Sequence, residues 1–257
     1  MFVFNKNLTN FKKPDLIISS SKLSRMLTKT YSSFDILFGR CTLPINILLS
    51  ECEKERIAEN INIVDYNRRD IIVKQNSRTS HIIYLSSGLV KISRELRKGK
   101  NLILKIEGAG NFVGLSSILG GEVYDFTVSA IEPCTAIYID VDIFTSILEK
   151  NGSLGIEISK QISKNTIFNI NRLSGLLYKQ LPGRVADLIL YFSEMIYHNS
   201  AFKFPLTRQE LAEICGTTKE SLIRTLSEFN HDRIIEMDRH NIKIISTDIL
   251  KTLSRLG

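Results

Sequence analysis

From Ile61 to Asp140 the chain alternates apolar and polar positions in short runs, which is the pattern of strands with one buried face. The runs read NIVDY, DIIVK, HIIYL, GLVKIS, NLILKIE, FTVSAI and TAIYID. Turn signals separate them, as at Gly108-Ala109-Gly110 and Gly120-Gly121. Many short strands at this spacing predict a closed antiparallel sandwich or jelly roll. A filled interior is the default for such a β-roll, and an enclosed ligand cavity is the alternative.

After Asp142 the apolar positions recur with the period of a helix. IFTSILEK predicts one helix, the residues Asn151-Gly152-Ser153 interrupt it, and LGIEISKQISKNTIFNINRLSGLLYKQ predicts a longer one. The longer helix is apolar on two sides and must be covered twice. One side contains Ile158, Ile162, Leu173 and Leu176, and the other contains Ile156, Ile167, Ile170 and Leu177. We expect one side to lie on the β-roll and the other to pair with a second copy of the chain, whereas burial within a single chain is the alternative.

We place the dimer seam on the first of these sides, next to two asparagines that can fix its register at some cost in stability. Its expected members are Ile158, Ile162, Asn165, Asn169, Leu173 and Leu176. A homodimer is favoured because the next part of the chain carries a motif that usually binds near-palindromic DNA in pairs.

That motif is PLTRQELAEICGTTKESLIRTLSEF, residues 205–229, which predicts a helix, a tight turn and a second helix. Thr207 and Glu210 form the capping-box pattern at the start of the first helix. Gly216 stands where that helix must end with a positive φ, and Thr217 or Thr218 can cap the second helix. The second helix turns Leu222, Leu226 and Phe229 inward and leaves Lys219, Glu220, Ile223 and Arg224 outward.

The outward face of the second helix carries groups that match base edges. Arg224 offers a fork for the O6 and N7 acceptors of guanine, a contact worth about 1–3 kcal/mol of discrimination. Glu220 can accept a hydrogen bond from cytosine, and Lys219 can reach a guanine or a phosphate. A helical hairpin with an ordinary solvated charged face is the alternative. The helix caps, the glycine at the turn and the row of inward-facing apolar residues all fit two helices joined by a tight turn. We therefore interpret the stretch as a DNA-binding helix-turn-helix.

The remaining segments complete an α+β protein with three parts. Leu181-Pro182-Gly183 ends the long helix and forms a hinge, after which RVADLILYFSEMIYH predicts another helix. RIIEMDRHNIKIIS predicts two short strands around a turn at 238–241, a wing, and DILKTLSRL predicts a terminal helix. A short entry helix is expected over residues 45–59. We therefore expect a basic, flexible extension over 1–33, a β-roll over 34–150, a dimerisation helix over 151–181 and a winged helix-turn-helix over 182–257.

Composition narrows the class of protein. Hydrophobic content of 43% and charged content of 24% are ordinary for a globular chain. No apolar run reaches the roughly 18 residues of a membrane span, and the N-terminus lacks a signal-peptide pattern. The four cysteines are scattered without a disulfide or zinc framework, so we expect a cytoplasmic protein. The net charge of +7 says little about DNA, because residues 1–40 hold seven Lys/Arg against two Asp, whereas residues 203–257 hold nine against eight Asp/Glu.

Two features look like cofactor sites and are better explained by the fold. Gly108, Gly110 and Gly114 resemble a dinucleotide fingerprint, but their spacing is wrong and no βαβ unit surrounds them, so tight turns are the better interpretation. His81 could bind haem or a metal, but no second ligand stands at ligand spacing. We predict no metal and no cofactor, and no catalytic motif points to an enzyme.

The order of β-roll, long helix, Pro-Gly hinge and winged helix-turn-helix resembles the Crp/Fnr family of bacterial transcription regulators. The blocks that carry the resemblance are SSGLVKIS (86–93), GNFVGLSSILGG (110–121), GRVADLILYFSE (183–194) and LTRQELAEICGTTKESLIRTLSEF (206–229). In the family, positions matching Lys219, Glu220 and Arg224 read bases, and those matching Thr218 and Ser221 lie at the phosphate backbone. The expected DNA-contacting set is Arg208, Thr218, Lys219, Glu220, Ser221, Ile223 and Arg224.

The resemblance also implies a cyclic-nucleotide-binding-like β-roll, with an effector pocket formed by Gly114, Leu115, Ser116, Tyr124, Asp125 and Phe126. Members that bind cyclic AMP carry Glu after the glycine matching Gly114, and an Arg-Ser pair that holds the phosphate. Here Leu115, Tyr124 and Asp125 stand at those positions. Without the arginine, the pocket lacks the bidentate donor that would bind the cyclic phosphate, and the added carboxylate repels it. We therefore predict an unidentified effector other than cyclic AMP.

An iron–sulfur cluster, as in oxygen-sensing members, is not expected, because Cys41 and Cys52 have ten residues between them and no third cysteine nearby. The sequence thus predicts a homodimeric regulator that binds near-palindromic double-stranded DNA, works with RNA polymerase and responds to a small-molecule effector. It predicts no contact with a membrane. The alternative is a signalling module whose helix-turn-helix contacts protein instead of DNA.

Overall fold

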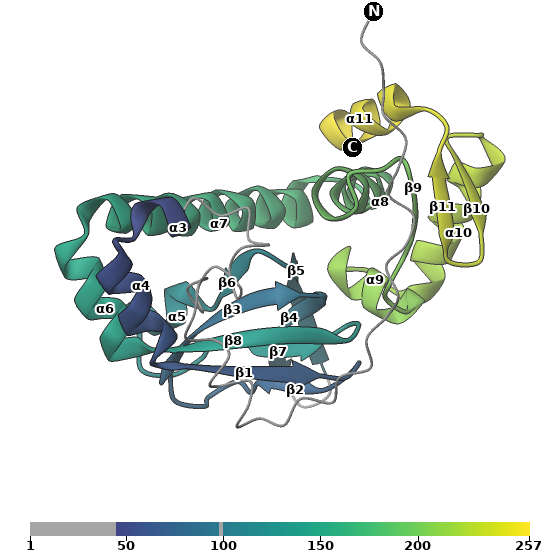
Figure 1. Ribbon diagram of the computed structural model, residues 1–257. Helices are drawn as coiled ribbons and strands as arrows, with labels where there is room; N and C mark the ends of the chain where they lie inside the picture. Colours follow the sequence, from purple (N-terminus) through teal and green to yellow (C-terminus); the bar gives the residue numbers. More distant parts are fainter. Residues whose placement is uncertain (1–44, 98–99) are drawn as a thin grey trace, which may run out of the picture.

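The computed structural model describes residues 45–97 and 100–257, and it contains a β-roll, a long helix and a C-terminal helical domain (Figure 1). The expected α+β fold class is confirmed. The extension predicted over residues 1–33 lies outside the described residues, as does Cys41. None of the helices in the described part of the chain is long and apolar enough to cross a membrane.

Two antiparallel four-stranded sheets form the β-roll. One has the order β1 (Ile61–Tyr66), β8 (Cys134–Asp140), β3 (His81–Ser87), β6 (Asn111–Val113), and the other β2 (Ile71–Val73), β7 (Thr127–Ala130), β4 (Leu89–Arg97), β5 (Lys100–Gly108). Each of the seven predicted runs contains one strand, and β6 was not predicted because three residues are too few to show alternation. Ile82, Ile83, Tyr84, Val128 and Ile137 belong to the buried apolar core of the β-roll.

A bulge in the β4–β5 pair turns part of β5 toward the C-terminal domain. Lys105 pairs with Ile92 and Ile103 pairs with Ser93, so Leu104 has no partner residue in β4. An extra residue shifts the alternation of side chains along the strand. As a result Ile103 and Ile106 are both buried in the apolar cluster of the C-terminal domain.

Short helices lie at the end of the β-roll where the long helix begins (Figure 1). The predicted entry helix is two helices, α3 (Ile45–Leu48) and α4 (Glu51–Ala58), because Ser50 forms a capping box with Glu53 and starts a new helix. Helix α5 (Leu115–Gly120) follows β6. Helix α6 (Val141–Lys150) ends at Asn151, whose side chain caps the long helix α7 (Gly152–Tyr178).

Helix α7 is covered by the β-roll on the side where we predicted the dimer seam, so this prediction needs correction. Ile158 is 2% exposed within the β-roll core, and Ile162 packs against the same core. Asn165 accepts a hydrogen bond from Lys105 Nζ at 2.8 Å. Leu176 lies against the turn of the helix-turn-helix. Of the predicted seam residues, Asn169 and Leu173 are the two that are exposed.

The opposite side of α7 is the exposed one. Its apolar residues are Ile156, Ile167, Ile170 and Leu177, with Tyr178 at the end of the helix. Their side chains are between 57% and 86% exposed, which is unusual for large apolar groups. The two apolar sides predicted from the sequence therefore exist. The side predicted to form the dimer seam packs largely on the β-roll, and the other side is exposed.

The C-terminal domain begins with α8 (Leu181–Leu190), which continues as the π-helical segment η1 (Tyr191–Ile196). A three-stranded sheet has the order β10 (Ile235–Asp238), β11 (Asn241–Ile244), β9 (Ala201–Lys203), and the helices are α9 (Arg208–Ile214), α10 (Lys219–His231) and α11 (Thr247–Leu256). The predicted wing is the β10–β11 hairpin. Strand β9 was not predicted because it is only three residues long.

Candidate nucleic-acid interface

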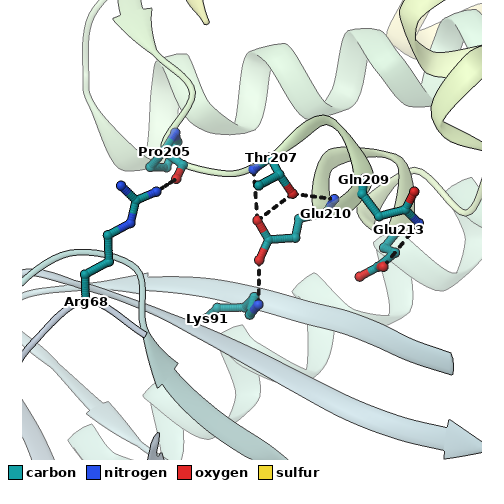
Figure 2. Close-up of polar contacts among 7 residues, drawn as sticks. All are labelled: Arg68, Lys91, Pro205, Thr207, Gln209, Glu210 and Glu213. Carbon is teal, nitrogen blue, oxygen red and sulfur yellow. Dashed lines mark hydrogen bonds and ion pairs between the residues drawn. The ribbon is translucent and has the colours of Figure 1, made fainter. Parts of the chain in front are cut away.

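The first helix of the helix-turn-helix starts at the predicted capping box (Figure 2). The Thr207 backbone N–H and hydroxyl both donate to Glu210 Oε2, at 2.8 and 2.9 Å. The Glu210 backbone N–H donates to Thr207 Oγ1 at 3.2 Å. These reciprocal bonds satisfy backbone donors that have no partner inside the helix, and so they determine where α9 begins.

Glu210 also connects this helix to the β-roll, a contact that the sequence did not indicate. Lys91 Nζ of β4 donates to Glu210 Oε1 at 2.6 Å, and Arg68 Nη2 donates to the Pro205 carbonyl at 3.5 Å (Figure 2). Burial alone would raise the pKa of Glu210, but the hydrogen bonds from Lys91 and Thr207 outweigh it and hold this pKa below the ordinary value.

The turn between the two helices depends on Gly216, as predicted. Its φ of +59° lies in the left-handed region. A Cβ at this position would also stand 2.9 Å from Leu176 Cδ2 of the long helix, so Leu176 would have to move to admit a side chain. The turn is thus determined both by its own backbone and by its packing on the long helix.

Helix α10 has one fully buried side and one open side. Of the two predicted caps, Thr218 is the one that accepts the Ser221 backbone N–H, at 3.2 Å. Leu222 and Leu226 are 0% exposed and hold the helix against the domain core. On the other side Lys219, Glu220, Ile223 and Arg224 are exposed, as predicted. The outward row is therefore presented by a helix that cannot rotate without exposing its core.

Arg208 does not lie on this row, although we predicted it among the DNA-contacting residues. Its Nη2 donates to the Arg239 carbonyl and contacts Met237 Sδ at 3.3 Å, and its Nη1 is buried without a partner in the described structure. Burial lowers the pKa of its guanidinium. Arg208 therefore fastens the start of α9 to the wing.

The wing tip offers a cation that the sequence reasoning missed. Arg239 is exposed at the turn between β10 and β11, where its φ is +53°. The signal in the sequence was the turn at 238–241, which was interpreted only as a turn. An exposed arginine is a side chain that can donate to a phosphate.

A cavity of about 220 Å³ in the β-roll contains most of the predicted effector pocket. It lies between β5, α5 and α7, and Gly114, Leu115, Ser116, Asp125 and Phe126 line it. Tyr124 does not: it is 4% exposed and its hydroxyl donates to the His81 carbonyl at 3.0 Å. That prediction was wrong because the loop between α5 and β7 turns residue 124 into the core.

The sequence did not identify the charged pair that dominates this cavity. Lys105 Nζ lies 2.6 Å from Glu107 Oε2, and burial raises the pKa of the Glu107 carboxyl although Lys105 opposes the shift. No arginine lines the cavity within the described residues. The one cation there is already neutralised by a carboxylate of the same strand, so the cavity offers little attraction to a lone phosphate.

Two family models match separate parts of the chain. A cyclic nucleotide-binding domain model matches residues 63–151, which form the β-roll, and a Crp-like helix-turn-helix domain model matches residues 183–253. The cAMP-activated global transcriptional regulator CRP of Pasteurella multocida is 21% identical over 197 residues, covering 75% of this chain and 94% of the relative.

Solved structures with the same arrangement of domains have similarly low identity. A transcriptional regulator of the crp/fnr family from Eubacterium rectale is 19% identical with a TM-score of 0.67, covering 83% of this chain and 98% of the other. The c-di-GMP responsive regulator CLP of Xanthomonas campestris is 19% identical with a TM-score of 0.65, covering 76% and 99%. The names of these relatives give different nucleotide effectors, so the shared fold leaves the effector of this chain open.

Proposed function

The chain belongs to the Crp/Fnr family of transcription regulators, and we propose that it acts as a homodimer whose two α10 helices read a near-palindromic operator in the cytoplasm. The observation that carries this proposal is the exposed row Lys219, Glu220, Ile223 and Arg224 on a helix whose other side is fully buried. A rigid helix with free polar groups is what major-groove recognition requires.

Within the row, each side chain has a chemical task. Arg224 reads a guanine through its O6 and N7 atoms, and Glu220 accepts from a cytosine amino group. Lys219 contacts a guanine or a phosphate. The hydroxyls of Thr218 and Ser221, at the positively polarised start of α10, lie at the backbone of the DNA.

The second subunit pairs through the exposed side of α7. Ile156 and Ile170 are fourteen residues apart, Leu177 follows Ile170 after seven, and Ile167 lies on the same side three residues before Ile170. Such spacing is that of a left-handed coiled coil of two helices. Four large apolar side chains that the chain itself leaves exposed are a sufficient reason for a partner helix.

Regulation enters through the β-roll cavity, which α7 covers. Asn165 and Ile162 of α7 line this cavity together with Lys105, so a ligand there displaces the long helix directly. A shift of α7 changes the spacing of the two recognition helices, which must match successive major grooves about 34 Å apart. The effector is not cyclic AMP, and RNA polymerase is the partner that converts occupancy of the operator into transcription.

The test is selection of bound sequences from random and genomic DNA fragments, followed by binding measurements at several salt concentrations. We expect an enriched inverted repeat, a stoichiometry of two chains per site and affinity that falls steeply with salt. A chain that stays monomeric, or that enriches no sequence at low salt, would contradict the proposal. In that case a helix-turn-helix that contacts protein becomes the better interpretation, and its binding would depend far less on salt.

A further inference from the structure

A second cavity, of about 230 Å³, lies outside the β-roll at the junction of α7, α8, η1 and α9. Its walls are largely apolar and are formed by Phe168, Leu176, Leu188, Tyr191 and Ile214. Its polar lining groups are Asn171, Arg172, Lys179, Arg184, Asp187 and Cys215. This junction cavity is separate from the effector cavity, because the two share no lining residue.

Arg172 brings a buried positive charge into the junction cavity. Its Nη1 donates to the Leu104 carbonyl, at the bulge of β5, and its Nη2 donates to the Ile214 carbonyl at 3.1 Å. Burial lowers the pKa of this guanidinium. Both acceptors are neutral carbonyls, so Arg172 has hydrogen bonds but no counter-charge from residues 45–97 or 100–257.

Arg184 brings a second positive charge that is less well satisfied. Its Nη1 donates to the Lys179 carbonyl at 2.9 Å, whereas its Nε is buried and has no hydrogen-bond partner. The nearby carboxylate does not serve it, because Asp187 is bound by Lys179 Nζ at 2.8 and 2.9 Å and by the Ser254 hydroxyl at 2.5 Å. A buried N–H without an acceptor is uncommon in a folded protein.

The charges of this cavity therefore do not balance within the described chain. Lys179 and Asp187 neutralise each other, and neither Arg172 nor Arg184 takes part in an ion pair with any described residue. Two guanidinium groups beside apolar walls are unfavourable unless an anion accompanies them. An anion in the cavity beside these two guanidinium groups would offset their charge.

We propose that the junction cavity is a second ligand site, which binds a small organic monoanion with an apolar body, such as an aromatic or short aliphatic carboxylate. The carboxylate lies at Arg184 and Arg172, and the apolar body lies among Phe168, Leu188 and Tyr191. The volume of the junction cavity is smaller than that of pockets for drug-sized ligands, which is about 300–1,000 Å³, so the ligand is small.

The position of this site gives it a regulatory consequence. Leu176 lines the cavity on one side and packs against Gly216, the turn of the helix-turn-helix, on the other. Ile214 and Cys215 at the end of α9 are also lining residues. A ligand in the junction cavity therefore sets how the DNA-binding domain sits on α7, independently of the β-roll effector.

Calorimetry and ligand-observed NMR on the full chain without DNA test the site, using benzoate and hexanoate as probes and benzamide and hexanamide as neutral controls of matched shape. We expect at least one carboxylate to bind at about millimolar concentration or below, and its amide to bind about tenfold more weakly, as for loss of one charge-assisted hydrogen bond. Arg184→Gln should weaken the carboxylate about tenfold and leave the amide unchanged. Arg184→Lys, which keeps the positive charge, should reduce the affinity for the carboxylate less than Arg184→Gln does.

Two further variants distinguish binding in the junction cavity from binding elsewhere on the chain. Leu188→Phe narrows the junction cavity and should weaken carboxylate and amide together, whereas Ser116→Leu, which narrows the β-roll cavity, should change neither. Melting temperatures close to that of the parent chain show that the variants fold. The proposal is overturned if no carboxylate binds, if acid and amide bind equally, or if Ser116→Leu removes the binding while Arg184→Gln does not. None of these outcomes depends on DNA binding.

Discussion

The recognition helix α10 and the β-roll cavity hold their charged side chains in opposite ways. Lys219, Glu220 and Arg224 are exposed and take part in none of the ion pairs among the described residues. In the cavity, Lys105 and Glu107 face each other at 2.6 Å and are largely buried. The helix presents free charge to an external partner, whereas the lysine of the cavity is already paired.

This difference explains why one region suggests its partner and the other does not. Unpaired groups on a rigid scaffold can be matched directly to acceptors and donors on DNA. A paired, buried lysine offers no net charge, so a ligand of the cavity must be recognised by shape and by neutral groups such as Asn165. Five measurements can break or sharpen this comparison.

The largest effect is expected from the buried side of α10. Leu226→Ala removes a 0% exposed side chain and should lower the free energy of unfolding by about 2–5 kcal/mol. Ile223→Ala, three residues earlier on the exposed side, should change it by less than about 0.5 kcal/mol. Urea unfolding of both variants gives the two values. Similar losses would mean that α10 has no distinct outward face.

Arg224 should affect DNA binding without affecting stability. Arg224→Ala should reduce operator affinity by about 1–3 kcal/mol and relax the preference at one base pair of each half-site. Arg224→Lys should retain part of the affinity but lose the bidentate geometry. Fluorescence anisotropy with the parent operator and with each substituted base pair measures both effects. Unchanged sequence preference in Arg224→Ala would remove this residue from the base-reading set.

The contact between Glu210 and Lys91 should contribute less to the free energy of unfolding than the buried side of α10 does. Glu210→Gln retains an acceptor for the Thr207 cap but removes the ion pair, and should cost about 0.5–1 kcal/mol. Glu53→Gln, in the capping box of α4, is the control, because Glu53 is held there by Ser50 and Asn151 and not by an ion pair to another domain. Thermal unfolding of both variants measures the difference.

The effect of Glu210 also has a defined pH dependence. Because the folded-state pKa of Glu210 is lowered, its stabilisation is fully present above the unfolded value of about 4.3 and is lost as the pH falls through the folded value. The gap in melting temperature between the parent chain and Glu210→Gln should be constant from about pH 5 to 7 and close below about pH 4. A gap that persists in acid would show that the carboxylate charge is not involved.

The smallest effect is the one expected from cyclic AMP. No arginine lines the β-roll cavity in the described structure, Asp125 lies in its wall, and Lys105 is neutralised by Glu107. Titration calorimetry with cyclic AMP should therefore give no heat of binding at micromolar concentrations. Micromolar affinity would show that the Lys105–Glu107 pair opens to admit a phosphate, and would erase the contrast between the two regions.

Local elements of this protein were predictable from the sequence. The capping box at Thr207, the positive φ at Gly216 and the buried Leu222 and Leu226 all agree with expectation. These features depend on residues within one helical turn or one strand of each other, so the spacing of residue types is enough to specify them. The outward row of α10 follows, because a helix with one side buried has only one side left.

The choice between equivalent faces was decided only by the tertiary structure. Helix α7 has two apolar sides in the sequence, and its packing on the β-roll decides which one is buried with Ile158 and which is left exposed with Ile170. The contact of Lys105 with Asn165 joins residues sixty positions apart, and that of Lys91 with Glu210 joins residues still farther apart. Local patterns show that a side chain needs a partner, but three-dimensional packing selects that partner from the whole chain.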